Sequence, residues 1–445
     1  MRGEELSIKQ ELINIYGGKV LSDTGDNQLN IWLDCYRGES FWINGYNLSS
    51  LNLGALIPHR LAQKAIMELK TKINDDELDQ DYQRVIENIS QITEYGLALG
   101  GITLKPYPTL EGISVDIVTP DMYIPIDVDN FGKISRILFL DRIERYERGE
   151  QVFYTRVEEH SKNIEEYIIT NKCYKSNHIS TIGREVDIKT VDIWSEIESM
   201  AITNIDYNLY GYFKNPQANN LDLKSPLGVS CFSRALSLMQ DADEQYNRLL
   251  WEFQSKETAI DADITMFKGG VDLPKHGERL FRQLNVNDDF YNVFSPDIRD
   301  DSLINGLNEI LKKIEDICGL SRGSISEVNY SAKTAAEIIA SKQTFYSTVT
   351  NIQKNLQTCL QDTVKAMAYW SDVKSYEVSF EWDDSILTDS DTERKIRLEE
   401  VAAGLMKPET YIAWRYGISE EEAIKRLPDV KINKVPNDYD LMEGV

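Results

Sequence analysis

The residue types that most often carry catalysis are present in this sequence, but they do not stand at the spacings that known reactions require. The four histidines are isolated from one another and no H-E-x-x-H pair occurs, so zinc chemistry has no ligand set. Residues 319–324 are rich in glycine and serine but lack the Gly-Lys-Ser/Thr ending that holds phosphate and magnesium in a nucleotide-binding loop. The sequence therefore predicts neither a metal ion nor a nucleotide cofactor.

Acidic clusters and one serine stretch are the remaining candidates for chemistry, and each has a simpler structural interpretation. Asp241 with Asp243, or the aspartates between 383 and 391, could imitate a set of metal ligands. Among 73 acidic residues such groupings arise by chance, and we interpret them as solvated faces. Ser225 and Pro226 open a stretch without the Gly-x-Ser-x-Gly elbow of a hydrolase, and a capped helix start fits it better. We expect no catalytic residues and no enzymatic activity.

The charge balance indicates what the surface can bind. The 445 residues include 48 basic and 73 acidic side chains, which give a net charge of −25. Tight binding to duplex DNA depends on Lys and Arg displacing phosphate counterions, so a free-standing duplex binder is disfavoured. Aromatic residues make up 10% of the chain, which favours broad packed surfaces or subunit interfaces.

Cysteine usage and the N-terminal residues indicate the compartment. The five cysteines have no C-x-x-C pair and no common spacing, an arrangement that predicts free thiols in a reducing environment. The first 18 residues carry charges where a signal peptide needs an apolar stretch, and no run of 18 apolar residues could span a membrane. We expect a soluble protein that is made in a cytoplasm and does not contact a membrane.

Hydrophobic periodicity divides the chain into a helical beginning, a β-rich middle and a mostly helical second half. Residues 1–100 show helical spacing, and from Ile102 to about Ile193 the period changes to two, which predicts a small antiparallel sheet or barrel. Beyond residue 225 the pattern predicts helices at 226–256 and 301–318 around a β-rich insertion. A polar loop and a helix from Ser331 to about Trp370, free of glycine and proline, follow.

Three stretches of residues make this order of elements resemble a known family. They are Phe213–Ser230, which ends in Ser-Pro-Leu-Gly-Val-Ser, the Gly-Leu-Ser-x-Gly of 319–323, and the Lys-Thr-Ala-Ala-Glu-Ile of 333–338. Together they resemble the portal proteins of tailed bacteriophages, in the siphophage-type branch found in phages of Gram-positive hosts. The resemblance covers roughly residues 30–427. It implies an α+β, mainly helical portal fold, with long stem and spine helices and a small β-barrel in the wing.

The family's fold implies a map of this chain. The implied regions are a wing at 1–225, a stem helix at 226–256, a clip at 257–300, a second stem helix at 301–318, a tunnel loop at 319–333, a spine helix with a wing strand at 334–388, and a crown at 389–445. Members of the family form a dodecameric ring at one capsid vertex. Double-stranded DNA passes through this ring during packaging and ejection. The resemblance implies the same head–tail connector role in the virion, after assembly in the host bacterial cytoplasm.

The resemblance also implies partners and a DNA-facing loop. The partners would be further copies of the chain in a dodecamer, double-stranded DNA bound without sequence specificity, terminase, a head–tail adaptor, and the major capsid and scaffolding proteins. In the tunnel loop, Arg322, Asn329 and Lys333 would meet DNA, whereas the alternative is that Arg322 and Lys333 pair with acidic neighbours. The glycines and serines of this loop predict that it flexes between its two helices.

Apolar side chains in the implied stem and clip predict contacts between subunits or with partner proteins. The stem helices would pack through Leu249, Phe253, Leu307 and Ile314, on stripes wider than one neighbouring helix needs. The clip is more aromatic than a solvated loop, so it would either dock a partner or form a small local core. Its aromatic residues are Phe267, Phe281, Phe290, Tyr291 and Phe294.

Two other classes of function remain open on the sequence. A packaging ATPase or nuclease of the same particle is disfavoured because the phosphate-binding loop and an ordered acidic triad are missing. Nucleotide turnover would separate that class from a portal. A helical scaffold or interaction protein without a channel shares the element pattern, and a ring with a central hole would separate the two.

Overall fold

The structure, a computed structural model, describes most of residues 2–427 of the chain. The residues it leaves out are 1, 19, 21–22, 45–47, 68, 164–165, 224, 256–258, 264–280, 285–290, 295–296, 298, 328–334, 383–389, 417 and 428–445. The chain forms two compact units, Met1–Trp382 and Asp383–Val445. Helices and mostly antiparallel sheets are combined in it, which is the α+β class that the sequence predicts.

Helices dominate the start of the first unit. Before residue 100 they are α1 (Arg2–Tyr16), α2 (Asp23–Arg37), α3 (Phe41–Asn44), α4 (Leu53–Ile66), α5 (Asp76–Glu87) and α6 (Ile89–Leu99). α5 begins after Asp75, whose carboxylate accepts a hydrogen bond from the Leu78 N–H at 3.0 Å. α5 ends at Asn88, whose own N–H reaches back to the carbonyl oxygens of the helix, and α6 starts at the next residue.

Strands occupy the middle of the first unit. They are β1 (Leu69–Ile73), β2 (Gly101–Thr109), β3 (Gly112–Val118), β4 (Tyr123–Val128), β5 (Ile134–Glu147), β6 (Glu150–Lys162), β7 (Tyr167–Ser176), β8 (Arg184–Val186), β9 (Met200–Thr203) and β10 (Gly211–Lys214). Among the described residues, β4-β5-β6-β7-β8 form one antiparallel sheet, with β9 also paired to β7, and β10-β2-β3 form a second.

The sheets are open, so the small β-barrel implied by the resemblance is not formed by the described strands. β4 lies at one edge of the six-stranded sheet, and β8 and β9 lie at the other. One face is covered by α1, where Leu12 packs on Ile124 and Val157. The other face packs on the second sheet through Phe139 and Tyr210. Because a helix and a second sheet already bury both faces, the edges do not have to meet.

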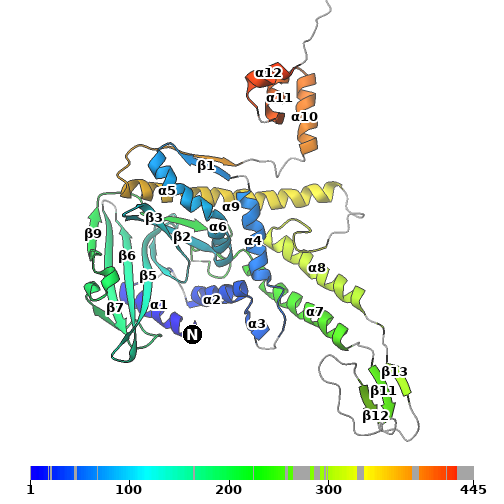
Figure 1. The fold of residues 1–445 in the computed structure, drawn as a ribbon, viewed down its shortest axis with the longest axis horizontal. Coiled ribbons are helices and arrows are strands. Elements are labelled where there is room, and N and C mark those ends of the chain that lie inside the picture. Colours follow the sequence, from blue (N-terminus) through cyan, green and yellow to red (C-terminus); the bar gives the residue numbers. More distant parts are fainter. Residues whose placement is uncertain are drawn as a thin grey trace, which may run out of the picture. The chain divides into compact units, whose positions relative to one another are not determined.

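The remaining elements of the first unit are long helices and a small sheet. They are α7 (Leu236–Ser255), β11 (Ala259–Asp263), β12 (Phe281–Leu284), β13 (Tyr291–Phe294), α8 (Asp300–Cys318), α9 (Ala335–Trp370) and β14 (Val378–Trp382). β11 pairs with β12 in parallel and with β13 in antiparallel orientation. β14 returns to pair with β1, with Val378 opposite Ile73 (Figure 1). α9 packs on β2 and β10, and its Leu356, Leu360 and Val364 are fully buried.

The helix predicted over 226–256 begins ten residues later, at Leu236, after a short 3₁₀ turn at Ser233–Ala235. Ser225 is not a helix cap: its hydroxyl accepts from the Leu227 N–H at 3.3 Å inside a local turn. Residues 229–232 are buried and run through the core without helical structure. The Cys231 N–H donates to the Leu97 carbonyl of α6, and the Val229 carbonyl accepts from Asn215 Nδ2, just after β10. These tertiary contacts override the local signals for a helix start.

The second unit contains α10 (Ser390–Ala402), α11 (Pro408–Tyr416) and α12 (Glu420–Arg426). The Ser419 hydroxyl caps α12 by accepting from the Glu422 N–H at 3.4 Å. α10 and α11 meet where the Arg397 guanidinium lies 4.2 Å from the centre of the Trp414 ring. This unit matches the helical tail that the sequence predicts after residue 389.

Candidate functional site

The candidate site comprises the antiparallel helices α7 and α8 and the loop after α8. These elements are joined to the sheets at a crossing, where the backbone at Gly228 passes directly over the backbone at Gly100. A side chain on Gly100 would place its Cβ 2.7 Å from the carbonyl oxygen of Gly228, so the two backbones touch there. The Asn215 N–H donates to the Gly100 carbonyl at 3.0 Å, and Asn215 Nδ2 donates to the Val229 carbonyl at 2.7 Å. The Cys231 N–H donates to Leu97 at 2.9 Å. These bonds fix the chain at the point where it leads into α7.

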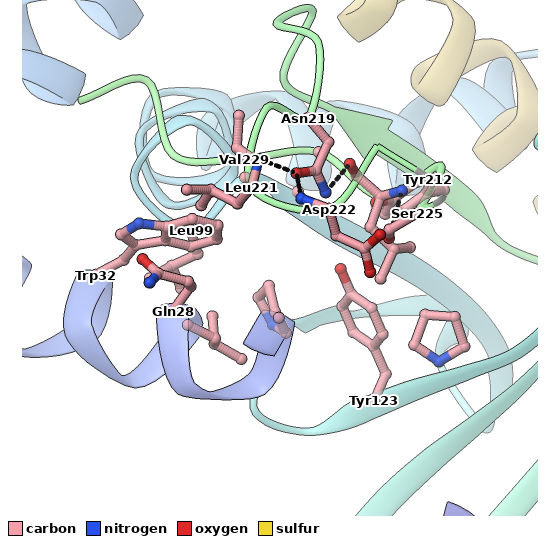
Figure 2. Close-up of a pocket in the computed structure, with 18 residues that line it drawn as sticks. Gln28, Trp32, Leu99, Tyr123, Tyr212, Asn219, Leu221, Asp222, Ser225 and Val229 are labelled. Carbon is pink, nitrogen blue, oxygen red and sulfur yellow. Dashed lines mark hydrogen bonds between the residues drawn. The ribbon is translucent and has the colours of Figure 1, made fainter. Parts of the chain in front are cut away.

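A small apolar cavity of about 60 Å³ lies beside this crossing (Figure 2). Trp32, Leu99 and Tyr123 line it together with the loop at residues 219–229. Asn219 Oδ1 accepts from the N–H groups of Leu221 and Asp222 at 3.0 and 2.9 Å, so this side chain shapes the loop over the cavity. Small-molecule sites start at roughly 300 Å³, so this cavity is a feature of packing.

The first half of α7 is held by a buried carboxylate. Asp243 Oδ2 accepts from the Trp42 indole N–H at 2.9 Å, and Asp243 Oδ1 accepts from the Leu51 N–H at 2.7 Å. Burial raises the pKa of Asp243, and the donated hydrogen bonds oppose that rise. The sequence suggested a solvated face for Asp241 and Asp243, and for Asp243 that interpretation is wrong because its side chain fastens α7 to the segment around α3.

α7 and α8 lie side by side, and polar contacts join them. Glu252 on α7 is buried and accepts from Arg299 Nη2 at 3.1 Å, just before α8 begins. Two turns earlier on α7, Gln245 Nε2 donates to the Leu303 carbonyl at 3.5 Å. The four stem residues named from the sequence fall in three environments: Leu249 and Ile314 are buried, Leu307 is half-buried and Phe253 is exposed.

Large apolar side chains remain exposed on this helix pair. Trp251 is 66% exposed and Phe253 is 43% exposed on α7, while Ile304 and Ile317 are exposed on α8. Exposed apolar side chains on neighbouring elements mark a surface that another protein can cover. The internal packing of the helix pair leaves these side chains uncovered, and the association between subunits that the wide stripes in the sequence predict stays a prediction.

The loop after α8 is anchored on a single side chain. Glu315, which is fully buried, accepts through Oε1 from the N–H groups of Gly323, Ile325 and Ser326 at 3.0, 2.8 and 2.9 Å. Its Oε2 accepts from the Ser326 hydroxyl at 2.8 Å. The described part of the loop, 319–327, is therefore fixed to α8. Four hydrogen bonds to Glu315 oppose the flexing that the sequence predicts for this loop, and sequence reasoning did not single out Glu315.

Of the three residues that the sequence places in the DNA channel, the structure describes Arg322 alone. Arg322 forms an ion pair with Asp316 of α8, and 27% of its side chain is exposed. This contact is the alternative that the sequence left open for Arg322. Asn329 and Lys333 lie outside the described residues.

The aromatic residues of the predicted clip are only partly described. Phe267 and Phe290 lie outside the described residues. Phe281 lies on β12, and Tyr291 and Phe294 lie on β13, but the surroundings of their side chains are outside the described part of the structure. Docking through these residues stays a prediction.

One histidine that is isolated in the sequence lies in a buried polar cluster. His160 Nε2 is 2.7 Å from Glu158 Oε1, and its Nδ1 is 2.7 Å from the Tyr167 hydroxyl. Lys105 on β2 donates to Glu158 on β6 at 2.7 Å and so joins the two sheets. Burial lowers the pKa of His160. Burial would raise the pKa of Glu158, but Lys105, His160 and Arg156 hold it well below its usual range. With 3% of its side chain exposed, His160 cannot touch a substrate.

The described ranges contain neither a metal-binding group nor a membrane-spanning helix. There, no group of three or more His, Cys, Asp or Glu side chains is arranged to hold a metal ion. No helix in the described part of the chain is both long and apolar enough to cross a bilayer. The five cysteines are unpaired and buried.

Comparisons with known proteins do not identify a family for this chain. No family model and no curated protein matches the sequence. Among solved structures, the chain is similar to a chain from the neck of a native GTA particle computed with C12 symmetry. The identity is 10% and the TM-score 0.38, over 87% of this chain and 94% of that one. A TM-score this low does not establish a common fold.

Proposed function

We propose that this chain is the portal protein of a tailed bacteriophage, a ring of twelve copies through which double-stranded DNA is packaged and ejected. One observation carries the proposal. The helix pair α7–α8 packs on itself yet keeps Trp251 and Phe253 exposed, and it leads through an anchored loop into the 36-residue helix α9. A subunit of a ring needs such a second association surface, because each copy contacts two neighbours through different faces.

The resemblance of three sequence stretches supports the same proposal. Within Phe213–Ser230, Asn215 and Gly228 make the contacts that lead the chain into α7. The Gly-Leu-Ser-x-Gly stretch at 319–323 forms the first half of the anchored loop. The first stretch thus lies where the chain enters α7 and the second where it leaves α8, and a ring-forming fold must keep the geometry of both places fixed.

The net charge is suited to a conduit. Each chain carries −25, so twelve copies would carry −300, and a duplex that passes such a wall gains little from counterion release. Shallow binding lets DNA slide. The tunnel loop would be the place of closest approach, where Arg322 could exchange the half-exposed Asp316 carboxylate for a phosphate.

The proposal includes partners and a location. The ring would lie at one capsid vertex of the virion, bound by the major capsid and scaffolding proteins, and it would dock first terminase and then a head–tail adaptor. Residues 257–300, with β11, β12 and β13, are the proposed docking end. The portal itself would carry no cofactor and catalyse no reaction, because the terminase motor supplies the work of packaging.

A helical scaffold or interaction protein without a channel is the alternative, and a packaging ATPase or nuclease is the less favoured one. The exposed apolar surface on α7 and α8 fits a scaffold equally well. His160 is buried, with 3% of its side chain exposed, which disfavours a nuclease centre that uses this histidine. Nucleotide turnover by the purified chain would identify the ATPase.

The DNA path is tested by removing the two loop charges. In the double variant Arg322→Ser, Lys333→Ser we expect folding and ring formation to persist, because a partly exposed ion pair such as Arg322–Asp316 contributes little to stability. The amount of DNA per particle, or its retention after purification, should fall. Arg60→Ser removes a charge of the same type from an exposed position on α4, outside the proposed loop, and serves as the control. Wild-type packaging and retention in the double variant would refute the assignment of the loop to the channel.

A further inference from the structure

One buried carboxylate, that of Glu315, holds the polar, glycine-rich segment after α8 in place. Glu315 lies in the last turn of α8, with its carboxylate fully buried and directed at residues 323–326. Four donors reach it: the N–H groups of Gly323, Ile325 and Ser326, and the Ser326 hydroxyl. A buried carboxylate is costly unless such donors satisfy it, and hydrogen bonds to a charged acceptor are roughly twice as strong as neutral ones. The carboxylate and the loop therefore depend on each other.

Two further contacts extend the anchor at both ends of the loop. Asn308, two turns earlier on α8, accepts through Oδ1 from the Glu327 N–H at 2.7 Å and donates through Nδ2 to the Glu327 carbonyl at 3.3 Å. Gly319, at a φ of 70°, ends α8 against Thr348 of α9, where a side chain would collide with the threonine. Residues 319–327 are thus fixed from Gly319 to Glu327 and touch both long helices.

We propose that Glu315 is the positioning residue of the channel loop, and that residues 319–327 move with α8 as one body and do not hinge at Gly319 or Gly323. This inference rests on the proposed portal function and deepens it. The Glu315 carboxylate sets the place at which the chain leaves α8, and with it the position of Arg322 toward DNA. A change in the loop's approach to DNA would then require a movement of α8 itself.

The test compares Glu315→Ala with Glu315→Gln. The glutamine Oε1 can still accept from the three N–H groups, while alanine removes the acceptor. Glu309→Gln is the matched control, because Glu309 is an exposed glutamate on the same helix, paired with Lys312. Amide hydrogen exchange of the purified chain reports the anchor, electron micrographs report ring formation, and DNA per particle reports function.

For Glu315→Ala we expect exchange at Gly323, Ile325 and Ser326 to be about tenfold faster or more, because these amides lose their acceptor. Rings should still form, and packaged or retained DNA should decrease. Glu315→Gln should restore both the exchange protection and the DNA. Glu309→Gln should change neither. If Glu315→Ala does not fold, Asn308→Ala releases only Glu327, and faster exchange there with reduced DNA retention supports the same conclusion.

Each contrary result has a distinct meaning. Unchanged exchange in Glu315→Ala would refute the anchor. Faster exchange together with wild-type packaging and retention would refute its use in positioning the loop for DNA. If the wild-type chain forms no rings, the portal function itself fails, and the exchange data still decide whether Glu315 holds the loop.

Discussion

The crossing of Gly100 and Gly228 allows a stringent prediction, because both sides of the contact are backbone. In Gly228→Ala the new methyl group would overlap the carbonyl oxygen of Gly100 and lie 3.1 Å from its carbonyl carbon. The third neighbour is the Lys214 side chain at 3.2 Å, which can move, whereas the backbone of Gly100 cannot do so cheaply. The two segments must therefore separate.

The cost of that separation follows from the bonds at the crossing. Hydrogen bonds from Asn215 to Gly100 and Val229, and from Cys231 to Leu97, join the two segments. Losing two of them costs about 1 kcal/mol each, and overpacking adds about 1–3 kcal/mol. We expect Gly228→Ala to lower the free energy of unfolding by about 3–5 kcal/mol, a large part of the usual total.

The assay is urea unfolding followed by tryptophan fluorescence, with Gly306→Ala on α8 as the control. A Cβ at Gly306 would meet only Gln245 Nε2 at 3.6 Å, an ordinary contact. Alanine favours a helix over glycine by about 1 kcal/mol, so the control should be as stable as the wild type or slightly more so. A change of less than about 1 kcal/mol in Gly228→Ala would refute the close crossing and the fixed lead into α7.

Three further predictions concern the helix pair and the buried cluster. Trp251→Ser with Phe253→Ser should leave the unfolding free energy within about 0.5 kcal/mol but weaken self-association at least about tenfold in sedimentation; wild-type association would show that this face is no interface. Leu249→Asp should instead destabilise the subunit by several kcal/mol, since it buries an unpaired carboxylate, and wild-type unfolding would contradict the burial. Burial lowers the pKa of His160, so below about pH 6.5 the unfolded chain binds a proton that the folded chain does not, and stability falls with falling pH. In His160→Gln the unfolding free energy should decrease less steeply with falling pH than in the wild type, by up to about 1.4 kcal/mol per pH unit. Urea unfolding of both proteins at pH 7, 6 and 5 measures this, and an equal pH dependence in the two would exclude a neutral buried His160.

Regular periodicity was sufficient to predict the long elements. The helix expected at 301–318 is α8 at Asp300–Cys318, and the expected long helix is α9 at Ala335–Trp370. Both carry strong helical spacing and lack internal breaks apart from Gly306, so local pattern and tertiary packing agree. The β-type alternation after residue 102 likewise predicted strands where the structure has them.

Tertiary contacts explain where the sequence prediction failed. The Ser225–Pro226 signal has the local form of a helix start, but Gly228 crosses Gly100, which lies far away along the chain, and the Val229 carbonyl accepts from Asn215, which lies outside any helical turn of this segment. Alternation predicts that strands form but not what covers their faces, so α1 and the second sheet could not be anticipated. The barrel expectation failed for that reason.

The loop shows a different limit. Glycine and serine are typical of flexible segments, and the composition alone supported flexing of 319–333. The available signal was Glu315, which follows Leu311 by four residues and so lies on the apolar side of α8. A charged residue in that position needs a partner, and the N–H groups of the following loop are the nearest donors. Recognising that requirement would have predicted the anchor.

The portal proposal requires that copies of this chain surround a channel, and electron microscopy of the purified protein can show whether they do. The proposal predicts rings with a central hole wide enough for a DNA duplex, viewed end-on in negative stain and resolved into twelve subunits by class averaging. It also predicts that the α7 variants Trp251→Ser and Phe253→Ser lower the fraction of particles in rings. Monomers alone, or solid particles without a central hole at the concentrations where the chain associates, would contradict it.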